Sequence, residues 1–137
     1  MSDETGIRPG EQRVPLPDTF DAGLYYLGRI HTPWTRREDC PKNSREARES
    51  GIVARIVVDP RFAGGLLDVA SATHLLILYW MDQARRGLVV QAPRHYGTPR
   101  GTFALRSPVR PNPIAASVVE LVKVEDNVVS VKGLDCI

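Results

Sequence analysis

Residues 101–117 read GTFALRSPVRPNPIAAS, and this stretch sets the conditions that the rest of the fold must meet. Pro108, Pro111 and Pro113 each fix φ, remove a backbone donor and hold the preceding residue in extended geometry. We therefore predict a stiff loop here, not a helix or a central strand. A stiff loop loses little entropy when it holds a ligand, but it can equally be a plain connection. The residues alone leave both interpretations open.

The composition predicts one globular domain without a membrane partner. The chain has 137 residues, enough for a hydrophobic core. No apolar run approaches the roughly 18 residues of a membrane span, and the N-terminus lacks a signal-peptide segment. Cys40 and Cys136 fit reduced thiols, so we expect a cytoplasmic protein. His31, His74 and His95 lie far apart without metal-ligand spacing, so we predict no metal site.

The charge distribution is uneven although the net charge is only +2. No acidic residue lies between Asp82 and Glu120. Arginine binds phosphate through two parallel hydrogen bonds and stacks on bases, so this interval predicts a surface for RNA or another anion. A solvated basic surface is the alternative. The arginines of the interval are Arg85, Arg86, Arg94, Arg100, Arg106 and Arg110.

The hydrophobic pattern predicts an all-β fold, a small closed or nearly closed β-barrel with short helical connections. Residues 1–22 have no hydrophobic period, so we expect a flexible N-terminal arm before a domain at 23–137. The apolar run at 74–81 predicts the central buried strand. Residues 35–50 predict either a short helix capped by Ser44 or a mobile loop, and 62–69 an irregular or short helical connection. The predicted strands are 24–30 (with Gly28 as a bulge or close approach), 52–59, 74–81, 88–91, 102–105, 117–124 and 127–131, the last two as a hairpin.

Four segments carry a resemblance to a known family. FALRSPVRPNPIAAS from Phe103 resembles the signature FATRSPxRPNPIGxS of the TsaA-like, or TrmO, family. LGRIHTPW at 27–34 resembles its opening IGxIxSPY/F, and THLLILYWMDQ at 73–83 its SHLWILFxFHQ. GLDCI at 133–137 resembles the start of its GLDxxDGTPxLDIKPY, so the domain is expected to lack the tail that continues this segment.

The resemblance implies a dimeric β-barrel methyltransferase that uses S-adenosyl-L-methionine. Its implied substrate is tRNA, methylated on N6 of the threonylcarbamoyl-modified adenosine 3′ of the anticodon. A methyltransferase with another acceptor, and a cofactor-binding module without catalysis, are the alternatives. The resemblance identifies no catalytic base. The cofactor contacts that it implies are Pro41, Lys42, Asn43, Ser44, Asp82, Gln83, Arg106, Arg110, Asn112, Ala116, Gly133, Leu134 and Asp135.

Two of the departures from the family pattern bear on the implied site. Asp82 stands where the family has His, which adds a negative charge. Ala115 stands where the family has Gly after PNPI, so a positive φ there would cost energy. The polar segment at 35–50 also lacks the family's PRQPG pattern.

Overall fold

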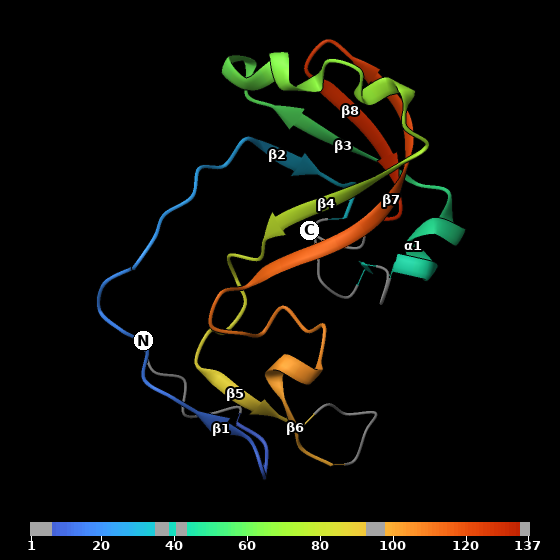
Figure 1. Ribbon diagram of the computed structural model, residues 1–137. Coiled ribbons are helices and arrows are strands. Elements are labelled where there is room, and N and C mark those ends of the chain that lie inside the picture. The colour runs from blue at the N-terminus through green and yellow to red at the C-terminus, as the bar shows by residue number, and fades with distance from the viewer. Residues whose placement is uncertain (1–6, 35–38, 41–43, 93–97, 135–137) are drawn as a thin grey trace. The chain divides into compact units, whose positions relative to one another are not determined.

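The computed structural model describes residues 7–34, 39–40, 44–92 and 98–134 (Figure 1). The chain forms two compact units, Met1–Ala22 with Leu78–Ala115, and Gly23–Ile77 with Ala116–Ile137. We call them the small-sheet unit and the large-sheet unit. Within the described ranges, no helix is long and apolar enough to cross a membrane.

The large-sheet unit holds most of a sheet with the strand order β2-β3-β8-β7-β4, in which the pairs β2–β3, β3–β8 and β7–β8 are antiparallel. Strands β3 and β8 are interior strands of this sheet. Strand β3 pairs with β2 and β8, and β8 pairs with β3 and β7. The sheet is strongly curved in Figure 1. Its strands are β2 (Gly28–His31), β3 (Val53–Val58), β4 (His74–Trp80), β7 (Ile114–Glu125) and β8 (Val128–Lys132).

Short helices connect these strands. Helix α1 is Ser44–Ser50, and the 3₁₀ helices η2 and η3 are Pro60–Leu66 and Val69–Ser71. The structure therefore selects the helix over the loop for this part of 35–50. The prediction of a short helical connection near 62–69 is confirmed as well.

The small-sheet unit holds a three-stranded sheet with the order β1-β5-β6. These strands are β1 (Gln12–Arg13), β5 (Leu88–Gln91) and β6 (Arg100–Gly101). The 3₁₀ helix η4, Thr102–Ala104, follows β6 and leads into the proline loop, which we define as residues 105–113. The expected all-β fold with short helical connections is confirmed.

The core of the large-sheet unit lies on one face of its sheet. Ala54 faces Val131 and Ile56 faces Val129 across the β3–β8 pair. Ala54, Val129 and Val131 are each at most 3% exposed, because cross-strand partners share a face. Helix α1, β7 and the end of the chain add the buried side chains Ala47, Val119 and Leu134.

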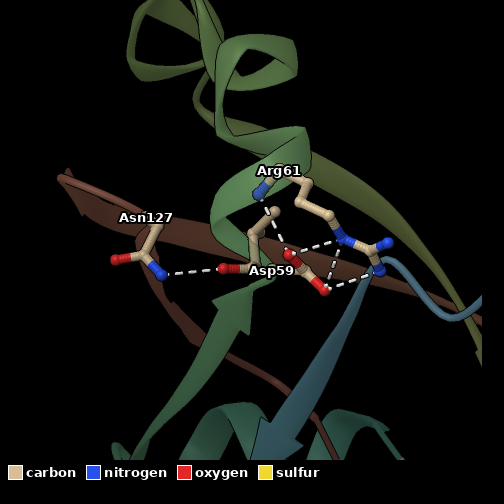
Figure 2. A network of polar contacts seen from close by, with 4 residues as sticks. Asp59, Arg61 and Asn127 are labelled. Atoms are coloured by element: carbon tan, nitrogen blue, oxygen red, sulfur yellow. Dashed lines mark hydrogen bonds and ion pairs between the residues drawn. The ribbon is translucent and has the colours of Figure 1, made fainter.

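One corner of this sheet is held by polar contacts at the end of β3. Asn127 donates from its side chain to the Val58 carbonyl at 2.7 Å, and its own carbonyl accepts from the Val58 N–H at 2.9 Å (Figure 2). Beside it, the Asp59 carboxylate accepts from the Arg61 backbone and guanidinium at 3.0–3.3 Å. The Asn127 contacts fix the tip of the β7–β8 hairpin to the end of β3, and the Asp59 carboxylate caps the start of η2.

Three strand predictions need correction. The apolar run at 74–81 forms β4, which lies at the end of the sheet order, not at its centre. Leu76 and Leu78 are 64% and 66% exposed, so β4 buries only one face. A continuous apolar run does not show whether a strand is buried on one face or on both. The predicted strand at 102–105 is the helix η4 instead, and the first predicted strand is shorter than 24–30.

The proline stretch is shorter than predicted at its far end. Residues 114–117 already belong to β7, because the last proline restricts the chain only up to Pro113. At Gly28 the expected close approach is present, since a Cβ there would clash with the Val57 carbonyl oxygen. The hairpin of β7 and β8 is confirmed, with Asp126 at φ 55° in its turn.

Residues 7–14 are attached to β5, although they belong to the segment predicted as a flexible arm. Arg8 donates from Nη1 to the Ala92 carbonyl at 2.7 Å, and the Glu11 carboxylate accepts from the backbone N–H of Arg8 and of Ala92, each at 2.8 Å. The flexibility of the whole arm stays a prediction.

Val119 and Val118 are neighbours on β7 that point to opposite faces and provide a matched test of the core. Val119 is fully buried and Val118 is 53% exposed. We expect Val119→Ala to lower the free energy of unfolding by about 2–3 kcal/mol, because it removes two buried methyl groups and leaves a cavity. Val118→Ala should cost less than about 1 kcal/mol. Urea denaturation of both variants measures the difference, and equal losses would contradict this assignment of faces.

Because of Glu11, we expect the free energy of unfolding to fall in acid. Burial acts to raise the pKa of its carboxyl, but the N–H donors of Arg8 and Ala92 and the charges of Arg8 and Arg85 outweigh burial and lower it from 4.5. The contribution of the Glu11 carboxylate to the free energy of unfolding is therefore complete above pH 4.5. It is lost as the pH falls through the lower pKa that Glu11 has in the folded protein.

Urea denaturation at pH 6 and at lower pH, on wild type and Glu11→Gln, tests this prediction. The wild type should lose more stability on acidification than the variant does. An identical pH dependence in both proteins would show that Glu11 is not responsible.

Candidate functional site

The proline loop is organised by the side chain of Arg110. Its guanidinium donates to the backbone carbonyls of Ser107 at 2.8 Å, Thr102 at 3.2 Å and Leu105 at 2.5 Å. Three prolines leave the stretch short of N–H donors while every residue keeps its carbonyl acceptor. A guanidinium carries five N–H donors in a fixed plane, so one side chain can satisfy several of these carbonyls.

Two buried polar side chains attach this loop to β5. Gln91, 7% exposed, donates from Nε2 to Thr102 Oγ1 at 2.9 Å and to the Val109 carbonyl. Thr102, 1% exposed, donates from its hydroxyl to the Leu88 carbonyl at 3.1 Å. The loop is thus held by a buried network, which favours a preorganised site over a plain connection.

Arg86 holds the other end of the loop. Its Nε donates to the Pro111 carbonyl at 2.6 Å and its Nη2 to Asn112 Oδ1 at 3.2 Å. The same guanidinium lies over the rings of Trp80 and Phe20, at 5.2 and 5.7 Å from their centroids. Arg86 and Arg110 therefore direct these N–H donors at groups of the small-sheet unit. The charge pattern of the sequence predicts an anion-binding surface that includes both arginines.

The structure brings two predicted cofactor contacts beside the loop. The Met81 N–H donates to the Pro113 carbonyl at 2.9 Å, which joins the residue before Asp82 to the residue after Asn112. Asp82 and Gln83 follow in an exposed turn. Arg106 is also exposed, so its charged group, like the Asp82 carboxylate, is accessible to a ligand.

The other predicted contacts belong to the large-sheet unit. Ser44 begins α1, and Ala116 is exposed on β7. Gly133 is buried with φ 109°, a conformation that favours glycine, and Leu134 is 1% exposed in the core. Pro41, Lys42, Asn43 and Asp135 lie outside the described residues.

Sequence reasoning missed Gln91, Thr102 and Arg86 as residues that shape the site. A single Gln at the end of a strand or a Thr before an apolar residue has no distinctive spacing. Their role depends on the fold, because the contacts join residues up to 26 positions apart. Within the described ranges, no three His, Cys, Asp or Glu residues could hold a metal ion together.

The fold and the loop define a small all-β domain whose ordered proline loop follows a three-stranded sheet. A family model described as the tRNA-methyltransferase O N-terminal domain matches residues 29–137. The chain belongs to this family, the TsaA-like or TrmO family, and the expectation from the motifs is confirmed.

Individual relatives agree with this assignment. A "Probable S-adenosyl-L-methionine-binding protein VirR" of Rhizobium radiobacter is 39% identical over 133 residues, 97% of this chain and 74% of the relative. The tRNA (adenine(37)-N6)-methyltransferase of Escherichia coli is 30% identical over 102 residues, 72% of this chain and 43% of that enzyme. A crystal structure of TrmO has a TM-score of 0.68 at 22% identity and 86% coverage of this chain, which supports the fold. The chain spans about half of that crystallised chain, 52%.

Arg110 and Arg106 lie in one loop but face different environments, which gives a matched test. We expect Arg110→Ala to lower the free energy of unfolding by about 2–3 kcal/mol, because partly buried carbonyls lose a charged donor. Arg110→Lys should recover only part, since an ammonium lacks the planar set of donors. Arg106→Ala should change stability by less than about 0.5 kcal/mol. Urea denaturation of the three variants checks this order, and an Arg110→Ala protein as stable as wild type would refute the organising role.

Proposed function

We propose that this protein binds S-adenosyl-L-methionine and transfers its methyl group to N6 of an adenosine in tRNA. The proposed target is the threonylcarbamoyl-modified adenosine 3′ of the anticodon. The observation that carries the proposal is the family match over residues 29–137, within which the motif loop is held in one conformation by Arg110 and Gln91. The names of the Rhizobium and Escherichia relatives support the cofactor and the acceptor respectively.

The exposed charged groups beside the loop fit the polar end of this cofactor. Arg106 can hold a carboxylate through two parallel hydrogen bonds, and Asp82 can accept from an amino group or a ribose hydroxyl. Arg110 directs Nε and Nη2 at three loop carbonyls, which leaves Nη1 for the cofactor contact that the family resemblance implies. We also assign Arg110 to positioning Arg106 and Asn112, two other predicted contacts on its loop.

The chemistry needs little from the protein besides position. When bound, the cofactor supplies a methyl group on a sulfonium, which leaves as a neutral thioether. The chain's own residues hold and orient the reactants, and for this a rigid loop is an advantage. The adenosine N6 loses a proton in the transfer, and no described residue is assigned as its acceptor.

Calorimetric titration with S-adenosyl-L-methionine, followed by methyl transfer to tRNA, tests the proposal. We expect micromolar binding by wild type and about 10- to 100-fold weaker binding by Arg106→Ala, the effect of one charge-assisted contact. Labelled methyl groups should then appear on adenosine N6 in bulk tRNA.

Two other outcomes would decide against parts of the proposal. Cofactor binding without transfer to any RNA would favour a binding module that lacks catalysis. Absence of cofactor binding would overturn the function as a whole. A homodimer, implied by the family resemblance, and a cytoplasmic location, expected from the composition, stay predictions, and sedimentation of the purified protein tests the first.

A further inference from the structure

The edge of the large sheet carries two arginines and a histidine that the proposed site does not use. Arg29 and His31 project from the same face of β2, the strand at one end of the sheet order (Figure 1). His31 lies opposite Arg55 of β3 in the antiparallel register. Cross-strand partners lie about 5 Å apart between Cβ atoms, so the three side chains share one small surface. We call Arg29, His31 and Arg55 the cationic edge.

Within the described ranges, the side chains of the cationic edge form no hydrogen bond or ion pair, and all three residues are exposed. Other exposed cations of this unit have partners: Arg45 pairs with Glu49 at 3.1 Å and Lys123 with Glu125 at 3.6 Å. On the paired strands, the carboxylates of this sheet face lie on β7, which β8 separates from β3. Arg29 and Arg55 therefore carry positive charge on this face with no carboxylate of the paired strands beside them, which suits an anionic partner.

A surface depression lies beside the cationic edge. Its volume is about 320 Å³, and Tyr26, Arg29 and His31 line it together with Val57 and neighbouring backbone. Tyr26 is 55% exposed, so its ring is accessible to a flat partner. Asp59 also lines the depression, but its carboxylate is engaged by Arg61 at 3.0 Å. The lining therefore offers an aromatic ring and two unpaired nitrogen-bearing side chains.

We propose that the cationic edge binds the phosphodiester backbone of looped RNA, and that Tyr26 stacks on one of its bases. This inference rests on the proposed function, because tRNA is the RNA that the protein would meet as substrate. Two arginines on neighbouring strands suit a chain of phosphates, and an exposed ring next to them suits an unpaired base. A free phosphate or a lipid headgroup would use the charges but not the ring.

The test measures binding of bulk tRNA by fluorescence anisotropy over a range of salt concentrations. Arg29→Gln with Arg55→Gln removes two contacts to phosphate. We expect the slope of log affinity against log salt to become shallower by about 1.4, and affinity at ~0.1 M salt to fall roughly 25-fold. Arg29→Lys with Arg55→Lys keeps both charges and should retain most of the slope.

A matched control removes two paired cations of the same unit. Arg45→Gln with Lys123→Gln changes the net charge equally, and it should leave the slope near that of wild type. Tyr26→Ala should weaken binding about tenfold without changing the slope, while Tyr26→Phe, which keeps a stacking ring, should bind as wild type does. Equal losses in the control and in the Arg29, Arg55 variant would show a general charge effect and overturn the proposal.

Titration with S-adenosyl-L-methionine separates failure of this proposal from failure of the proposed function. If wild type methylates tRNA and the Arg29, Arg55 variant binds it with an unchanged slope, the cationic edge is wrong and the function stands. If wild type binds the cofactor but no tRNA, the RNA acceptor and the cationic edge both fail. Binding to phosphatidylserine vesicles instead of tRNA, lost in the variant, would assign the edge to a membrane surface.

Discussion

The guanidinium of Arg110 is the constraint on which the candidate site depends. A loop with three prolines cannot donate enough N–H groups to satisfy its own carbonyls, and one planar cation supplies them from inside the loop. Gln91 and Thr102 then connect this loop to β5, so the path of residues 105–113 is determined by buried polar contacts more than by apolar packing. The positions of Arg106 and Asn112 therefore depend on these contacts.

Much of this fold follows from the sequence, but its polar interior does not. Alternating β-branched residues predicted β3 and the β7–β8 hairpin, because each strand buries one face and its pattern records that face. The apolar run of β4 was misleading, since Leu76 and Leu78 are exposed and composition alone cannot tell an edge strand from a central one. The motif residues marked the correct loop. What holds the loop could not be predicted, because Gln91 and Arg86 act on residues far along the chain.

Two pairs of described arginines play different parts that a count of charge does not distinguish. Arg86 and Arg110 direct their donors at backbone carbonyls, and Arg86 also packs on two aromatic rings. Arg29 and Arg55 lie exposed on the large sheet without a described partner. The same residue type thus holds the proline loop in one unit and leaves accessible positive charge on the sheet of the other.

The double hydrogen bond between Val58 and Asn127 has a consequence for engineering the protein. It makes the β7–β8 turn a structural joint, with Asp126 already in a left-handed conformation, so an insertion or a dye there would break the joint between two strands. Gly64 and Gly65 of η2 differ, because a side chain added at either would meet no atom within 4 Å. A reporter group for following ligand binding therefore belongs on η2, where it leaves the sheet intact.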